Sequence, residues 1–122
     1  MKALLDTNFL IACVKRKIQI FEYLEEHFSE VLLPRGVIDE LVRVAQHGAP
    51  RDRAAAEIAL KLISLSPVHV LPFTGYVDQQ IVGYLREHEG IVVATLDKKL
   101  QRILQARAKL LVIRGSKKLG IV

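Results

Sequence analysis

Two aspartates in this sequence each follow a short apolar run. Asp6 ends the segment KALLD, and Asp97 follows the segment IVVATL in the C-terminal third of the chain. An aspartate at such a place often caps the helix that comes next, because its carboxylate accepts hydrogen bonds from free backbone amides. It can also belong to a group of carboxylates that binds a metal ion. Each of the two residues, taken alone, fits either role.

A third aspartate, Asp78, has an unusual position on a helix that the sequence predicts over residues 76–90. On a helical wheel, it falls on the flank of the apolar stripe, beside Val82 and Leu85, and not on the polar side. A carboxylate that faces a core is unfavourable unless it is paired or binds a metal. Its place in the first turn softens this argument, because the helix dipole favours negative charge there. Asp78 is still the most informative of the three aspartates.

A fourth acid comes from the segment GVIDELVRV. Glu40 borders the apolar positions Val37 and Val44 on the wheel, and Asp39 lies slightly further round, next to Arg43. The angular difference is too small to choose between the two acids, and either of them also fits a solvated helix face.

Carboxylates that converge on one crevice repel each other, and a hard divalent cation removes that repulsion. Ligands that are all oxygen favour Mg²⁺ or Mn²⁺. Zinc is disfavoured, because the only cysteine, Cys13, lies in an apolar segment and is predicted to be a core residue. The histidines are scattered, at positions His27, His47, His69 and His88. Mg²⁺ and Mn²⁺ commonly serve phosphoryl chemistry, and neither a Walker-type loop nor a Gly-x-Ser-x-Gly elbow is present. A phosphodiester is therefore the expected substrate class.

The charge balance agrees with a polyanionic partner. The chain has 122 residues and a formal net charge of +5. Its basic residues concentrate in the stretch 15–17 and in the C-terminal third, namely Lys98, Lys99, Arg102, Arg107, Lys109, Arg114, Lys117 and Lys118. Both groups also fit a solvated surface. A single thiol, no apolar run long enough for a membrane helix, and an N-terminal apolar stretch broken by Asp6 and Asn8 predict a cytoplasmic protein without a membrane partner.

The apolar pattern predicts one α/β domain over residues 1–122. Continuous apolar runs, typical of strands buried on both faces of a parallel sheet, lie at residues 2–5, 31–33, 68–73, 91–94 and 110–113. Helical periods start near Phe9 and cover residues 20–28, 36–48, 52–66, 76–90 and 97–108, with Gly48 as a C-cap. This alternation predicts a three-layer α/β/α sandwich with a central parallel sheet of about five strands. If the strand order is flavodoxin-like, the first and fourth strands flank the ligand crevice, which brings Asp6 and Asp97 together.

The motifs of this chain resemble those of the PIN-domain ribonucleases over essentially its whole length. The matching segments are LLDTNFLI (4–11), VIDEL (37–41), VDQQI (77–81) and VVATLDKKL (92–100). The first and last are specific, and the order and spacing of all four strengthen the match. The resemblance implies a PIN-like fold and an acidic endoribonuclease site that depends on Mg²⁺ or Mn²⁺.

Carried over by position, the catalytic and metal-binding acids would be Asp6, Glu40, Asp78 and Asp97. The resemblance, and not the helical wheel, selects Glu40 over Asp39. Thr7, Asn8 and Thr95 would be supporting polar residues that orient the carboxylates. Lys98 and Lys99, at the start of the last predicted helix, would hold the RNA backbone.

Two biological roles stay open within this resemblance. The C-terminal segment LLVIRGSKKLGIV is most similar to archaeal PIN proteins related to the rRNA-processing nucleases of the small ribosomal subunit. Toxins of VapBC toxin-antitoxin modules share the core motifs and have nearly the same length. The partners would be RNA, together with an antitoxin or a ribosome-assembly partner. An apolar surplus in the first helices predicts a homodimer; it comprises Phe9, Leu10, Ile11, Ile20, Phe21 and Leu24.

The alternative function is a catalytically silent PIN-fold module that binds RNA or protein. The complete set of four acids argues against it. A phosphate-accepting receiver domain is disfavoured, because the acid pair expected directly after one strand is missing.

Overall fold

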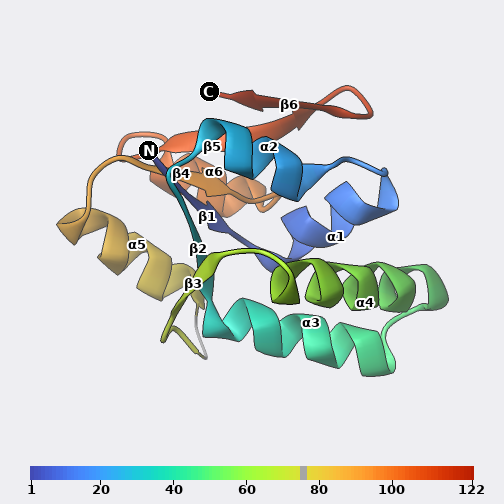
Figure 1. Cartoon of the computed structure of the whole chain (residues 1–122). Helices are drawn as coiled ribbons and strands as arrows, with labels where there is room; N and C mark the ends of the chain where they lie inside the picture. The colour runs from blue at the N-terminus through green and yellow to red at the C-terminus, as the bar shows by residue number, and fades with distance from the viewer. Residues whose placement is uncertain (75–76) are drawn as a thin grey trace.

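The computed structural model describes residues 1–74 and 77–122. Gly75 and Tyr76, and with them the first residue of the helix predicted over 76–90, lie outside the described residues. In chain order the elements are β1 Lys2–Leu5, α1 Thr7–Lys15, α2 Ile20–His27, β2 Glu30–Pro34, α3 Arg35–His47, α4 Pro50–Ser64, β3 Val68–Leu71, α5 Val77–Glu87, β4 Ile91–Ala94, α6 Lys98–Leu104, β5 Lys109–Arg114 and β6 Lys118–Ile121 (Figure 1).

The sheet has six strands in the order β3-β2-β1-β4-β5-β6. The first five strands pair in parallel, and β6 pairs antiparallel with β5. This confirms the predicted parallel sheet of about five strands and adds β6. The flavodoxin-like order is wrong, since that order is 2-1-3-4-5. The chain instead winds outward from β1 through β2 to β3, and then from β4 through β5 to β6. The point where the winding reverses therefore lies between β1 and β4, which are neighbours as expected.

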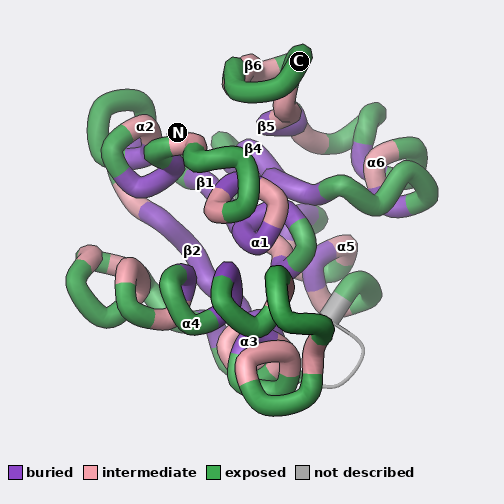
Figure 2. Tube along the Cα trace, turned by 90° about the vertical axis from the view of Figure 1, so that its right-hand side faces the viewer, coloured by how far each residue is buried: buried purple, intermediate pink, exposed green. Residues whose placement is uncertain are grey.

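Strand side chains alternate between two cores, one on each face of the sheet. Leu5 and Leu33 belong to the core under helices α1 to α4, whereas Leu4 and Leu32 belong to the core under α5 and α6. Figure 2 shows β1, β2 and β4 as buried segments between helices whose outer sides are exposed. The predicted three-layer α/β/α architecture is thus confirmed.

The strand β3 differs from its prediction. It ends at Leu71 and not at residue 73, and its burial is lower than expected, because it forms an edge of the sheet. His69 and Val70 are both exposed on it. An edge strand has a neighbour on only one side, so apolar content alone overstated how far this segment is buried.

The apolar residues of the first two helices belong to the core of the single chain. Phe9, Leu10 and Leu24 are fully buried, and even Phe21 keeps only 9% of its surface exposed. The predicted surplus on these helices is therefore wrong, and the homodimer stays a prediction without that support. Cys13 is fully buried in the same core, as predicted. Its burial raises the thiol pKa to about 12, which makes it a poor nucleophile.

Gly48 is the C-cap of α3, as predicted, but for a different reason. Its φ is −70°, a value that every residue type can adopt, so the position does not require the left-handed conformation that favours glycine. A Cβ at Gly48 would lie 2.7 Å from the backbone oxygen of Val44. The helix end therefore approaches this residue too closely for a side chain.

Several helices differ from their predicted bounds. Helix α5 ends at Glu87 and not at residue 90, and α4 spans Pro50–Ser64 instead of residues 52–66. Helix α1 starts at Thr7 and not near Phe9, because Asp6 is its N-cap. Helix α6 ends at Leu104 and not at residue 108. None of the helices in the described ranges has the length and apolar character needed to cross a membrane.

Candidate active site

The ends of β1 and β4 are joined by side-chain and backbone hydrogen bonds. Leu5 and Ala94 are partners in the parallel pair, and the amide of Asp6 donates to the carbonyl of Ala94 at 3.0 Å. The hydroxyl of Thr95, whose residue is only 1% exposed, donates to Oδ2 of Asp6 at 2.9 Å. The other oxygen, Oδ1, accepts the amide of Thr7 at 2.8 Å. The Asp6 carboxylate is therefore fixed through both of its oxygens.

Asp97 is held by the same threonine and caps the next helix. Its amide donates to the Thr95 hydroxyl oxygen at 3.1 Å. Its Oδ1 accepts the amides of Lys99 at 2.9 Å and Leu100 at 3.1 Å, which makes Asp97 the N-cap of α6. Within the described residues, Oδ2 of Asp97 accepts no hydrogen bond. The capping role is thus present, and one oxygen is left for other chemistry.

Several charges act on Asp6 at once. Burial is the largest effect and raises the pKa of Asp6 above its ordinary value. The hydrogen bonds from Thr95 and Thr7 lower the pKa in part, and the negative charges of Asp97 and Glu40 raise it further. Asp6 therefore lies near two other candidate acids, whose charges disfavour its ionised form.

Asp78 completes the acidic group from the other side of the sheet, at the start of α5. Partial burial raises its pKa, and the charges of Asp6 and Asp97 add to that increase. Asp78 is exposed and does not point into the core, which agrees with its predicted place on the flank of the apolar stripe. The apolar stripe of α5 is formed by Ile81 and Leu85, which are buried, and Asp78 lies at its boundary. A boundary residue can reach the acids at the strand ends while staying partly hydrated.

The structure separates Glu40 from Asp39. Glu40 is half-buried, and its negative charge raises the pKa of Asp6. It also forms an ion pair with Arg43, which lies one turn further along α3. Asp39 is exposed and faces solvent. The geometry therefore supports the choice of Glu40, which the helical wheel alone could not make.

The other predicted residues contribute unequally. Thr95 bridges two acids, and Thr7 holds Asp6 through its backbone amide. Asn8 is exposed and makes no hydrogen bond to the acids in the described part of the chain. Lys98 is exposed at the start of α6. Lys99 lines a cavity of about 260 Å³ together with Asp78 and Asp97.

Sequence reasoning missed Gln101. Its side-chain Nε2 donates to the carbonyl of Thr95 at 2.7 Å and so holds the residue that bridges Asp6 and Asp97. Gln101 lies one turn after Asp97 on α6, on the side that faces the strand ends. Its spacing from Asp97 was the available signal, but a glutamine on a short helix is usually a solvated residue.

Comparison with known proteins identifies the family. Residues 3–116 match the family model described as PIN like domain. The chain belongs to this PIN-like family. Ribonuclease VapC4 of Methanocaldococcus jannaschii is 27% identical over 117 residues, which cover 92% of this chain and 89% of that protein. The solved structure of the PIN domain endonuclease Utp24 matches with a TM-score of 0.75 and 28% identity, over 98% of this chain and 90% of that one. The resemblance to PIN-domain ribonucleases is confirmed, and these relatives support a nuclease function.

The acidic group of this PIN domain suits a hard cation by its chemistry. All of its donors are carboxylate oxygens, which are the ligands that Mg²⁺ and Mn²⁺ prefer. In residues 1–74 and 77–122, however, no three His, Cys, Asp or Glu side chains lie close enough to hold a metal ion as they stand. The acids are close enough for the charge of one to raise the pKa of another, but they do not surround a common point. A shared ion would require side chains such as Asp78, which is exposed, to turn toward Asp6.

Proposed function

We propose that this PIN domain is an endoribonuclease that hydrolyses RNA phosphodiester bonds and uses Mg²⁺ or Mn²⁺ bound at Asp6, Glu40, Asp78 and Asp97. The observation that carries the proposal is the bridging of Asp6 and Asp97 by Thr95 at the carboxyl ends of β1 and β4, with the charge of Glu40 raising the pKa of Asp6 and the charge of Asp6 raising the pKa of Asp78. The charges of these acids oppose the ionisation of Asp6 and Asp78. A bound cation would reduce the repulsion between these carboxylates and would favour their ionised forms. The ribonuclease name of the VapC4 relative supports RNA as the substrate.

Each acid has a distinct task in this proposal. Asp6 is the rigid centre, because Thr7 and Thr95 restrain both of its oxygens. Asp97 offers Oδ2 while its Oδ1 caps α6. When bound, a divalent ion would supply hydroxide from water near neutral pH and would offset negative charge on the phosphate. Glu40, restrained by Arg43, would orient the attacking water or complete the ion site.

Two lysines at the start of α6 would position the RNA. Lys99 lines the cavity next to Asp78 and Asp97, so its ammonium group is available to a phosphate on that side of the acids. Lys98, its exposed neighbour, would contact the backbone further along the strand. These contacts would hold the strand without reading its sequence.

The test is cleavage of a labelled single-stranded RNA with Mg²⁺, with Mn²⁺ and with a chelator. Glu40→Gln should lower the rate about 100-fold or more, whereas Asp39→Asn, which changes the exposed neighbouring acid, should leave it unchanged. Asp6→Asn and Asp97→Asn should also abolish cleavage. Variants as active as the parent would place the observed cleavage in another site or in a contaminant.

The silent-module alternative is separated from the enzyme by calorimetry with Mn²⁺. A heat of binding that disappears in Asp6→Asn supports the proposed site. No acid-dependent binding, together with no cleavage, favours the silent module. A small gene that overlaps the start of this one would favour the toxin role, and its absence would favour RNA processing.

A further inference from the structure

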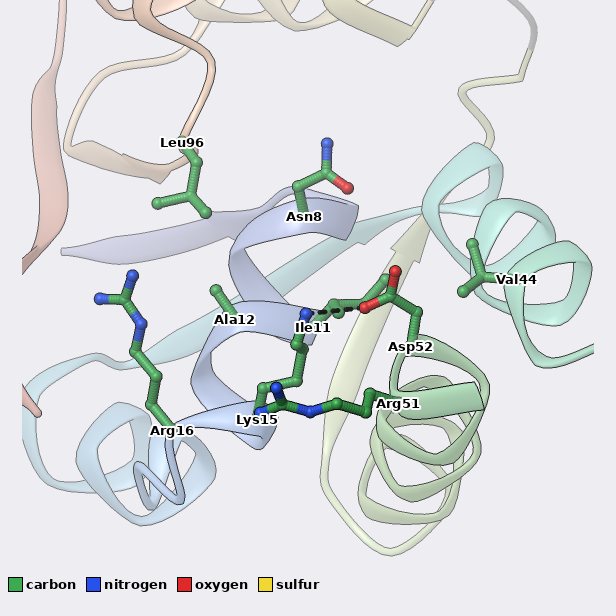
Figure 3. A pocket seen from close by; sticks show the side chains of 9 residues that line it. All are labelled: Asn8, Ile11, Ala12, Lys15, Arg16, Val44, Arg51, Asp52 and Leu96. Carbon is green, nitrogen blue, oxygen red and sulfur yellow. Dashed lines mark hydrogen bonds and ion pairs between the residues drawn. The ribbon is translucent and has the colours of Figure 1, made fainter. Parts of the chain in front are cut away.

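A second hollow lies next to the acids, on the opposite face of the sheet from the cavity of Lys99. It has a volume of about 480 Å³ and is bounded by α1, the last turn of α3, the start of α4 and the loop after β4. This volume falls within the range of about 300–1,000 Å³ that is usual for ligand clefts. Its walls include the apolar side chains of Ile11, Val44 and Leu96 (Figure 3).

The hollow carries an excess of positive charge. Lys15, Arg16 and Arg51 line it, against the single acid Asp52. Asp52 is engaged by Lys15 at 2.8 Å, so this pair is neutral as a unit. Within the described ranges, neither Arg16 nor Arg51 has an acid at ion-pair distance. Two guanidinium groups in one concavity repel each other, and an anion between them would remove that repulsion.

The side chains are arranged around the hollow and come from different elements. Figure 3 shows Arg51 extending from the start of α4 toward α1, and Arg16 extending from the end of α1 along another wall. The Lys15–Asp52 ion pair joins the same two helices. A guanidinium group also suits a phosphate well, because it can donate two parallel hydrogen bonds to two oxygens.

The rim of the hollow is formed by residues that adjoin the acids. Asn8 lies two positions after Asp6, and Leu96 lies between Thr95 and Asp97. The rim therefore gives a strand that is bound at the acids a route into the hollow.

We propose that this hollow, defined by Lys15, Arg16 and Arg51, binds a backbone phosphate of the RNA strand that is cut at the acids. This inference rests on the proposed nuclease function and adds the path of the substrate. The strand passes from the cavity of Lys99, across Asp6 and Asp97, to the two arginines. The apolar wall supplies no base-reading groups, so the hollow contributes to affinity and not to sequence preference.

The experiment measures binding of a labelled 12-nucleotide single-stranded RNA by fluorescence anisotropy in chelator, where cleavage is suppressed. The double variant Arg16→Gln/Arg51→Gln is compared with Lys17→Gln/Arg53→Gln. The control removes the same charge from exposed residues next to the first pair in sequence but outside the lining of the hollow. Melting temperatures of both variants verify that they fold.

The hollow variant should bind RNA about ten-fold or more weakly than the control variant. Its plot of log K against log salt should also be shallower, by about 0.7 for each phosphate that the variant no longer binds. With metal, its cleavage of the same RNA should show a raised KM and an unchanged kcat, because the reacting groups are untouched.

Equal affinity and equal salt slope in the two variants would overturn the inference, and would leave the hollow to a protein partner. If the parent cleaves RNA in that case, the proposed function stands and only the substrate path is wrong. If instead the parent binds RNA through the hollow but cleaves nothing with either metal, the substrate path stands and the nuclease function fails.

Discussion

Asp6 is restrained through both of its carboxylate oxygens, and its ionised form is still disfavoured. Its oxygens accept hydrogen bonds from Thr7 and Thr95, and burial still raises its pKa. Between the ordinary carboxyl pKa and the raised value, the folded chain binds more protons than the unfolded chain. Stability therefore falls as the pH rises through this interval and stays lower above it.

The first prediction concerns Asp6→Asn without metal. Asparagine removes the titrating charge but keeps only one of the two acceptor oxygens, so it loses one hydrogen bond at every pH. The melting temperature of the variant relative to that of the parent should therefore be higher at pH 7 than below the ordinary pKa of 3.8, where the parent carboxyl is protonated in both states. Circular dichroism melts from pH 3 to pH 8 in chelator measure this difference. A difference between the two proteins that is the same at pH 3 and pH 7 contradicts this expectation.

The second prediction concerns the Thr95 hydroxyl. It donates to Asp6 and accepts from the amide of Asp97 in a site that is 1% exposed. Thr95→Val leaves both partners without that hydrogen bond and should destabilise the fold by about 1–3 kcal/mol. Thr95→Ser keeps the hydroxyl and should restore most of that stability. Urea unfolding distinguishes the two variants, and equal midpoints for valine and serine would show that the bridge contributes nothing.

At the scale of elements, α6 is attached to β4 through Asp97, which serves as cap and as candidate ligand. Aspartate and asparagine are both good N-caps, whereas alanine is not. Substitutions at this position therefore separate the structural task from the chemical one.

The third prediction follows from this difference. Asp97→Ala should lower the free energy of unfolding by about 1 kcal/mol, while Asp97→Asn should stay close to the parent. Both variants should be unable to cleave RNA, because neither offers a carboxylate. Paired unfolding and cleavage measurements test this outcome. An active Asp97→Asn enzyme would reduce Asp97 to a helix cap.

The fourth prediction compares two glycines at helices. Gly83 lies inside α5, and a Cβ there would meet nothing within 4 Å. Gly83→Ala should therefore stabilise the protein by about 0.5–1 kcal/mol, because alanine is the better helix former. Gly48→Ala should destabilise it, since its Cβ would lie 2.7 Å from the Val44 oxygen. Thermal unfolding of the two variants should give shifts of opposite sign, and shifts of the same sign would refute this account.

The strands whose side chains are buried on both faces of the sheet could be predicted from the sequence. The strands β1 and β4 are continuous apolar runs, so their place inside a parallel sheet was predictable. The strand β6 was not predicted, because KLGI is short, partly polar and exposed at an edge. The neighbourhood of β1 and β4 was predicted from a wrong strand order, since alternation of elements does not determine the order of strands.

Within the candidate site, the strand-end aspartates follow from sequence position alone, whereas Glu40 was chosen over Asp39 only through the family resemblance. Asp6 and Asp97 are placed by the backbone of the sheet, which their sequence position reveals. The exposure of Asp78 and the preference for Glu40 over Asp39 depend on how α3 and α5 are rotated against the sheet. Gln101 was missed because its hydrogen bond with Thr95 is tertiary.

At the scale of the whole molecule, the proposed ion binding would be coupled to folding. The proposed ligands come from β1, α3, α5 and the loop after β4, and only the folded chain brings them together.

The fifth prediction is that Mn²⁺ or Mg²⁺ raises the melting temperature of the parent. At a free ion concentration of about 100 times the dissociation constant, the free energy of unfolding should increase by about 2.7 kcal/mol. A thermal titration of the parent and of Asp6→Asn measures this gain, which should be absent in the variant. An equal gain in both would mean that the ions bind elsewhere.

The order of the sheet also has a consequence for synthesis of the protein. Strand β1 is synthesised early, but it lies at the centre of the sheet. It can pair with β4, through Leu5 and Ala94, only after β4 has been synthesised. Asp6 acquires its bond from Thr95 only when the last third of the chain has left the ribosome. A nascent chain therefore carries the first acid of the site without its partners. The proposed site can therefore form only after most of the chain has been made.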